Sequence, residues 1–306
     1  MTIPVKAGIW FLLCNILQKG IVAITTPIYT RLLSVREYGV VSVYYSWQDL
    51  LSILTTFGLQ SVVFSKGLVN NEEKKDEYTK VMVNLSLFTT CCSFGIYLLF
   101  SNFFNAFIGF PICVVFMMYM YNLFYGVIEF WIQKKRVTYE YIPVVLVTVL
   151  LSLLRPILSI FLIKLGIGNN FYIRIICDVI IVILIGSPIF CSIQKKGRML
   201  WDKKIWQSSM YFVIPLIPHY LSQRVLSQSD RIMINRMVGE TQAGIYSLAY
   251  SVGMLLMLLN SAIDSTMSPW IFRNMKNKNY AKISSMSQKL IMFYALCVEC
   301  FIIITP

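Results

Sequence analysis

Arg31-Leu-Leu-Ser-Val-Arg-Glu-Tyr-Gly39-Val-Val-Ser-Val-Tyr-Tyr-Ser46 returns 205 residues later, without a gap, as Arg236-Met-Val-Gly-Glu-Thr-Gln-Ala-Gly244-Ile-Tyr-Ser-Leu-Ala-Tyr-Ser251. Five of the sixteen positions are identical, and both copies lie in a polar turn between two long apolar runs. The repeat predicts a membrane protein built from two related helix bundles, as in many secondary transporters. Chance similarity is the alternative, because interfacial turns favour Gly, Tyr and Arg whatever their ancestry.

The composition outside this motif is that of a membrane protein. The mean hydropathy is +0.68, with 57% hydrophobic and 13% charged residues, whereas about a quarter of the residues of a soluble domain are charged. A membrane-spanning helix needs about 20 apolar residues, and we therefore predict an all-α polytopic fold. The predicted spans are residues 8–30, 38–64, 81–102, 111–132, 142–164, 171–192, 208–229, 242–268 and 288–306.

We interpret the net charge of +13 as an indication of membrane topology rather than of a nucleic-acid partner. Eighteen Lys and Arg residues lie in the N-terminal segment and in the loops that follow the second, fourth, sixth and eighth spans, against five on the other side. This asymmetry places the N-terminus and the basic loops in the cytoplasm. The first span has no small-residue cleavage site and carries Lys19, so we expect a retained helix rather than a signal peptide.

The positions of the two motif copies predict the domain organisation. Six spans separate them, so both enter the membrane from the same side, and the two halves are related by an axis along the membrane normal. We expect a six-helix bundle over residues 1–194, a cytoplasmic linker over 195–207, and a three-helix part of a second bundle over 208–306. The chain stops inside an apolar segment, which we interpret as a C-terminal truncation.

The seventh span combines a cationic face with two prolines. Tyr220, Arg224, Ser227, Gln228 and Arg231 share one helical face. Guanidinium groups beside hydroxyl and amide groups suit phosphate or carboxylate oxygens. In the alternative, Arg231 pairs with the adjacent aspartate or with a neighbouring helix. Two prolines three residues apart predict a discontinuous or hinged helix, or else a static kink.

Arg155 is the sharpest single candidate for binding, because it lies near the middle of the fifth span on a face with Thr148, Ser152 and Ser159. A buried arginine is costly unless it has a partner. The alternative to a ligand is a carboxylate from another helix, either Asp49 or Asp178.

Carboxylates in the spans raise the question of coupling to an ion. Asp49 and Asp264 are the best placed to carry H⁺ or to hold Na⁺. Glu129 and Asp178 look structural, the latter because Arg174 precedes it by four residues. His219, the single histidine, is expected to be a satisfied core or interface residue rather than a proton relay.

Several chemistries have no support in the sequence. It contains no G-x-x-x-x-G-K-[ST], H-E-x-x-H or G-x-S-x-G motif and no clustered Cys and His metal set. The eight cysteines all fall in or against apolar runs, so we expect small hydrophobic residues rather than disulfides. We therefore predict a transporter without a metal or an organic cofactor.

Several groups of residues resemble a known family. They are Asn15 with Gln18-Lys19, the stretch from Pro27 to Ser42, Ile214-Pro-Leu-Ile-Pro218, Ser229-Asp-Arg-Ile-Met-Ile234, and Ala243-Gly-Ile-Tyr-Ser-Leu-Ala-Tyr250. Together they are similar to the polysaccharide biosynthesis flippases, the O-antigen flippase (Wzx-like) type within the multidrug/oligosaccharidyl-lipid/polysaccharide exporter superfamily. That family usually has twelve or fourteen helices, so the resemblance also implies an incomplete second bundle here.

The resemblance implies that the protein moves an undecaprenyl-pyrophosphate-linked sugar repeat unit across the bacterial inner membrane by alternating access. Its partners would then be the lipid-linked oligosaccharide, the surrounding lipids, a polysaccharide polymerase and a chain-length regulator. A pyrophosphate needs cations in the cavity, and the candidates are Lys19, Arg31, Arg155, Arg224 and Arg231.

Three other functions remain open on the sequence. A drug exporter with the same fold would have a cavity dominated by carboxylates and aromatic residues. A membrane enzyme that polymerises or acylates surface sugars would show a catalytic carboxylate or histidine in a sizeable outer loop. The third alternative is an inactive truncated product.

Overall fold

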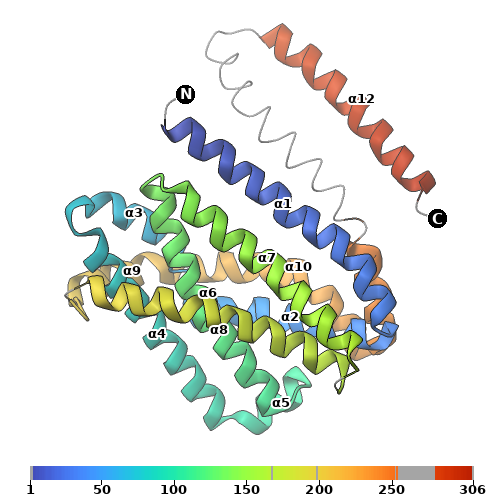
Figure 1. Ribbon diagram of the computed structural model, residues 1–306, viewed down its shortest axis with the longest axis horizontal. Coiled ribbons are helices and arrows are strands. Elements are labelled where there is room, and N and C mark those ends of the chain that lie inside the picture. The colour runs from blue at the N-terminus through green and yellow to red at the C-terminus, as the bar shows by residue number, and fades with distance from the viewer. Residues whose placement is uncertain (1–2, 167, 198, 252, 254–279, 305–306) are drawn as a thin grey trace. The chain divides into compact units, whose positions relative to one another are not determined.

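The computed structural model describes residues 3–166, 168–197, 199–251, 253 and 280–304, and these residues form helices joined by short turns, with no strand among them (Figure 1). Helical bounds are α1 (Ile3–Leu32), α2 (Val35–Thr56), α3 (Val62–Asn70), α4 (Lys75–Leu99), α5 (Ser101–Ile108), α6 (Ile112–Val137), α7 (Tyr141–Lys164), α8 (Asn170–Lys196), α9 (Lys203–Val213), α10 (Ile217–Met237) and α12 (Tyr280–Ile304). Residues 240–251 are also helical. The predicted all-α class is confirmed.

The protein crosses the membrane several times. In the described part of the chain, α4, α6, α7 and α8 are both long enough and apolar enough to span a bilayer. The other long helices, α1, α2, α10 and α12, also have enough residues to cross a bilayer. Each of these eight helices overlaps one of the predicted spans, and the helix that starts at residue 240 overlaps the predicted span 242–268.

The second predicted span is too long at its C-terminal end. The chain leaves the helix after Thr56, because Phe57 and Gly58 both adopt positive φ angles, of 52° and 69°. A Cβ at Gly58 would also lie 3.0 Å from the ring of Tyr220. Glycine is therefore favoured at this turn, and the apolar run continues in a separate short helix, α3.

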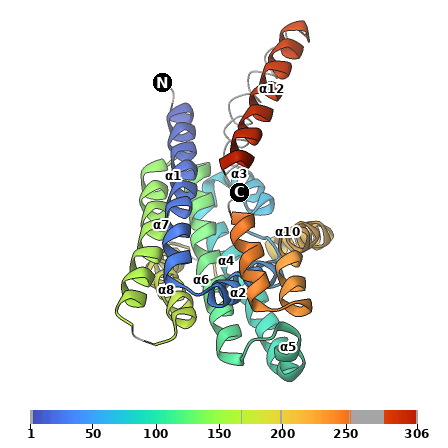
Figure 2. The ribbon, with the colours of Figure 1, turned by 90° about the vertical axis from the view of Figure 1, so that its right-hand side faces the viewer.

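Helix α6 lies at the centre of the first compact unit, which comprises Met1–Ser247. It packs against α8, α4, α2 and α7, while α1 packs on α7 and α10 packs on α2 (Figures 1 and 2). The second unit, Leu248–Pro306, contributes one described helix, α12. The predicted boundaries at residues 194 and 208 stay predictions, and α9 and α10 belong to the first unit.

The two copies of the repeated motif contact each other at equivalent positions. A Cβ at Gly39 would lie 1.9 Å from the carbonyl oxygen of Glu240, and one at Gly244 would lie 2.2 Å from the carbonyl oxygen of Val35. Val35 and Glu240 each occupy the fifth position of their copy, and the glycines the ninth. The contact is therefore two-fold related in its positions. Only glycine permits so close an approach of two helices.

The seventh predicted span is interrupted at its two prolines. Instead of one helix over residues 208–229, the chain forms α9, a 3₁₀ turn over Ile214–Leu216, and α10. Pro215 and Pro218 lie at the starts of the 3₁₀ turn and of α10, where the missing backbone N–H disturbs the helical hydrogen bonding least.

Candidate functional site

A polar cavity of about 350 Å³ lies between α1, α2, α6, α7 and α8, and we call it the chamber. Arg155 of α7 and Arg174 and Asp178 of α8 supply its charged groups. The other polar residues that line it are Gln18, Thr25, Thr26, Tyr29, Tyr38, Tyr45, Tyr125 and Ser152. The chamber therefore combines two guanidinium groups with four tyrosine rings in the interior of a membrane protein.

Arg155 is held by two tyrosines of α6. Its guanidinium carbon lies 5.4 Å from the ring centres of both Tyr121 and Tyr125, and these two rings stack at 5.3 Å. One terminal nitrogen, Nη1, donates a hydrogen bond of 3.0 Å to the hydroxyl of Tyr121. The Nε and Nη2 atoms are buried and have no hydrogen-bond partner. Aromatic faces thus orient the cation while part of its donor set stays unused.

Arg174 has a similar environment near the start of α8. Its guanidinium carbon lies 3.5 Å from the ring centre of Tyr29 and 5.7 Å from that of Tyr45. The Nε and Nη1 atoms are buried without a hydrogen-bond partner. The hydroxyl of Tyr29 forms a hydrogen bond with Ser159 of α7, which fixes the ring under the guanidinium.

Asp178 does not neutralise either arginine by a direct ion pair. Its carboxylate accepts a hydrogen bond from the hydroxyl of Tyr45. Among the described residues, no carboxylate oxygen lies within 4.0 Å of a guanidinium nitrogen of Arg155 or Arg174. Two cations against one carboxylate leave the chamber with an excess of positive charge. Buried donors without partners are costly, so an anion with several acceptor oxygens fits this site.

The predicted polar face of α7 is directed into the bundle. Ser152 and Arg155 line the chamber, and Thr148 and Ser159 are buried. The face forms because residues at i, i+4, i+7 and i+11 lie on one side of a helix.

A second cluster of polar side chains joins α2 to α10, and we call it the α2–α10 tie. Asp49 Oδ2 accepts hydrogen bonds from Arg224 Nη1 at 3.3 Å and from Gln228 Nε2 at 2.8 Å. Gln228 Oε1 accepts from Ser46 Oγ at 3.0 Å and from Arg231 Nη1 at 2.9 Å. The cationic face of α10 is therefore used in contacts with its neighbour.

The structure does not bring the five candidate cations together. Arg155 lines the chamber, while Arg224 and Arg231 belong to the α2–α10 tie. Lys19 and Arg31 are exposed residues of α1 and line neither.

Only one of the two candidate coupling carboxylates, Asp49, lies in the described part of the chain. Asp49 forms an ion pair with Arg224, and Asp264 lies outside the described residues. Neither Asp49 nor Asp178 forms the ion pair with Arg155 that was the alternative to a ligand.

The sequence interpretation missed Arg174 and the tyrosines of the chamber. Arg174 and Asp178 were interpreted as an ion pair because they are four residues apart, but this spacing also directs both side chains into the same cavity. Tyr121 and Tyr125 have the same spacing on α6, and that repeat could have indicated an aromatic platform for a cation.

Comparison with known proteins places these features in a family. A family model described as "Polysaccharide biosynthesis protein" matches residues 5–275, which include every residue of the chamber. The chain belongs to the polysaccharide biosynthesis protein family.

One curated relative is similar over a short segment of this family member. It is the "Lsg locus putative protein 1" of Haemophilus influenzae, 28% identical over 79 residues, or 24% of this chain and 20% of that protein. The chain thus matches about a fifth of that relative's length. No solved structure matches this member of the polysaccharide biosynthesis protein family.

Proposed function

We propose that this protein is a flippase that moves a pyrophosphate-linked oligosaccharide lipid from the inner to the outer leaflet of a bacterial cytoplasmic membrane, with its N-terminus in the cytoplasm. Family membership and the multi-pass helical fold support a transport role in polysaccharide biosynthesis. The observation that carries the substrate class is the set of four buried nitrogen atoms of Arg155 and Arg174 that have no hydrogen-bond partner.

A pyrophosphate is the part of such a lipid that a membrane interior excludes most strongly, since each charge is costly there. Guanidinium groups bind phosphate oxygens through paired N–H donors, and these bonds are stronger where water is scarce. The chamber volume of about 350 Å³ falls within the usual range of small-molecule sites. Arg155 and Arg174 would therefore hold the pyrophosphate during its passage.

The tyrosines that lie against the two arginines have a separate part in the proposal. The rings of Tyr29, Tyr121 and Tyr125 lie against the two guanidinium groups, so each cation keeps its orientation when the anion leaves. The same positive charge disfavours a cationic drug as the substrate, because like charges repel strongly at low dielectric constant.

The direct test is a flipping assay with the full chain reconstituted in phospholipid vesicles. The probe is a fluorescent sugar joined to a polyprenol through pyrophosphate, and the control probe carries the same sugar through an uncharged linker. We expect protein-dependent loss of the charged probe from the leaflet that a membrane-impermeant quencher reaches, with little movement of the neutral probe. Equal movement of both probes, or no movement above that in protein-free vesicles, contradicts the proposal.

A genetic test complements the assay. Deleting the gene in its host should remove long surface glycan and leave lipid-linked repeat units on the cytoplasmic leaflet. Normal surface glycan after deletion would exclude the role in export.

A further inference from the structure

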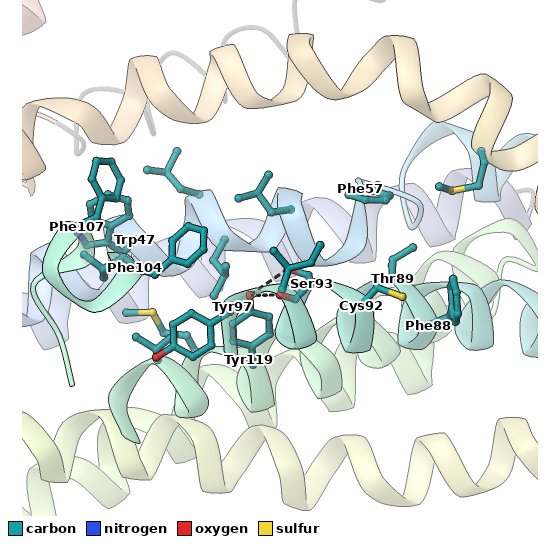
Figure 3. A pocket seen from close by; sticks show the side chains of 18 residues that line it. Trp47, Phe57, Phe88, Thr89, Cys92, Ser93, Tyr97, Phe104, Phe107 and Tyr119 are labelled. Carbon is teal, nitrogen blue, oxygen red and sulfur yellow. Dashed lines mark hydrogen bonds between the residues drawn. The ribbon is translucent and has the colours of Figure 1, made fainter. Parts of the chain in front are cut away.

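A second cavity, of about 480 Å³, lies on the other side of α2 from the chamber, and we call it the groove (Figure 3). Leu50, Leu51 and Leu54 of α2 line it, together with residues of α4, α5 and α6 and Met210 of α9. Trp47, Phe104 and Phe107 lie at one end, and Phe57 and Phe88 lie toward the other. The groove is therefore elongated and mostly hydrocarbon.

The hydroxyl groups of the groove already have partners. Ser93 and Tyr119 share a hydrogen bond of 3.0 Å (Figure 3). Tyr97 donates to Asn105 at 2.8 Å, and Thr89 donates to the carbonyl oxygen of Thr55 at 2.7 Å. The lining thus offers few free donors to a polar ligand, in contrast to the chamber, and it suits an apolar chain.

A cation lies at one end of the groove. The guanidinium carbon of Arg236, in the last turn of α10, is 4.6 Å from the ring centre of Phe107. An amphiphile whose hydrocarbon lies along the groove would therefore present its first polar group to Arg236. A phosphate is the anionic group that arginine binds best.

The size of the groove sets the length of chain that it accepts. The lining residues of α2 run from Trp47 to Leu54, and Phe57 follows at the C-terminus of the helix, so this side of the groove is about 15 Å long. This length matches roughly three isoprene units, each with four backbone carbons joined by bonds of about 1.5 Å.

We propose that the groove binds the phosphate-proximal isoprene units of the polyprenyl chain, with the phosphate at Arg236. This inference rests on the proposed function, since it concerns the lipid end of the same substrate, at a stage of transport when its pyrophosphate is not in the chamber. Bilayer lipid is as apolar as the groove, so burial alone gives no preference. Selectivity comes from the fit of methyl-branched, unsaturated units against seven aromatic side chains of the lining and from the attraction of Arg236 for phosphate.

Photolabelling of the full chain in phospholipid vesicles tests the site. The probe is a polyprenyl phosphate with a diazirine on its second isoprene unit, and the comparison probe is phosphatidylglycerol with a diazirine on an acyl chain. We expect the polyprenyl probe to label the α4 peptide that contains Cys92 and Ile96, and unlabelled polyprenyl phosphate to compete. Equal labelling by both probes, without competition, would mean that ordinary lipid fills the groove and would overturn the inference.

Two matched substitutions on α4 test whether the polyprenyl probe is labelling the groove itself. Ile96→Trp fills the groove, whereas Leu98→Trp adds a comparable volume at an exposed residue outside its lining. Steric overlap between the tryptophan ring and the isoprene units predicts about a tenfold drop in polyprenyl labelling for Ile96→Trp, and little change for Leu98→Trp. Reaction of Cys92 with N-ethylmaleimide should slow when polyprenyl phosphate is present, whereas reaction of Cys91, which does not line the groove, should not.

The flipping assay separates the two proposals. Ile96→Trp should slow the flipping of a long-tailed substrate and leave that of a one-isoprene analogue unchanged. If wild-type protein flips the substrate and Ile96→Trp labels and flips like wild type, the groove inference fails and the flippase proposal stands. If wild-type protein flips nothing while the groove still labels selectively, the flippase proposal fails instead.

Discussion

The chamber and the α2–α10 tie both contain arginines of helices inside the bundle, but these arginines have different partners in the two places. In the tie, Arg224 meets the carboxylate of Asp49 and Arg231 meets Gln228. In the chamber, Arg155 and Arg174 lie on tyrosine rings, and four of their nitrogen atoms have no hydrogen-bond partner. A cation with a carboxylate partner stabilises contact between helices, whereas a cation held by tyrosine side chains, without a carboxylate, keeps donors for a ligand.

The largest expected effect is on transport through the chamber. Arg155→Met and Arg174→Met should each lower the flipping rate about 100-fold, because each removes charge-assisted bonds to the pyrophosphate worth about 3 kcal/mol. Thermal stability in detergent should not fall, since an unpaired buried charge is removed. Arg224→Met is the matched control, with a smaller loss of transport. A large loss of stability in the chamber variants would show that their arginines are structural.

The next largest effect is expected on thermal stability, from a substitution in the repeated motif. This substitution tests whether the glycine contact next to the α2–α10 tie holds α2 in place. Gly39→Ala inserts a methyl group 1.9 Å from the carbonyl oxygen of Glu240, and overpacking of this kind costs about 1–3 kcal/mol. Gly95→Ala, in α4, meets nothing within 4 Å and should be neutral or slightly stabilising. Equal thermal midpoints for the two variants would contradict the glycine contact.

A double-mutant cycle measures the tie itself. Arg224 and Asp49 are 3.3 Å apart, with side chains 46% and 42% exposed, so their coupling should be about 1 kcal/mol or less. Arg224→Met alone and Asp49→Asn alone should each lower the thermal midpoint. The double variant should lose less than the sum of the two. Strict additivity would mean that the pair contributes no net attraction.

The smallest effect is expected outside the membrane, at the turn between α6 and α7. Lys135, hydrogen-bonded to Glu140, holds the pKa of this carboxyl below its ordinary value. A lowered folded-state pKa stabilises the protein above the unfolded-state pKa, and this stability is lost as the pH falls through the folded-state pKa. Glu140→Gln should therefore cost about 0.5 kcal/mol near pH 7 and nothing at a pH below both pKa values. If the wild type and Glu140→Gln still differ in stability at a pH below both pKa values, the ion pair is not the cause of the difference.

The sequence predicted most of the fold because apolar runs and proline positions act locally. Eight of the nine predicted spans overlap long helices in the described part of the chain, and the interruption at Pro215 was expected from the chemistry of proline. The end of α2 at Thr56 was missed because hydropathy continues through the turn at Phe57 and Gly58. The short helix α5 was missed as well, since it lies mostly in the segment between two predicted spans, where a loop is expected from the sequence.

The candidate site was harder to predict for a different reason. The face of α7 that carries Arg155 could be read from helical spacing, and the structure directs it into the chamber. Arg174 was interpreted as the structural partner of Asp178, because a spacing of four residues fits both an ion pair and a shared cavity wall. Only the position of Tyr45 on α2, whose hydroxyl binds Asp178, distinguishes these two outcomes.

The sequence by itself determined that this protein is an all-helical membrane protein with a repeated motif, because hydropathy, helical periodicity and glycine positions are properties of single segments. The tertiary structure decided which arginines keep free donors and which meet a carboxylate. It also decided that Gly39 packs near Gly244, and that α2 separates a polar chamber from an apolar groove. The physical reason is that the electrostatic state of a buried cation depends on side chains from other helices, whose register no single segment encodes.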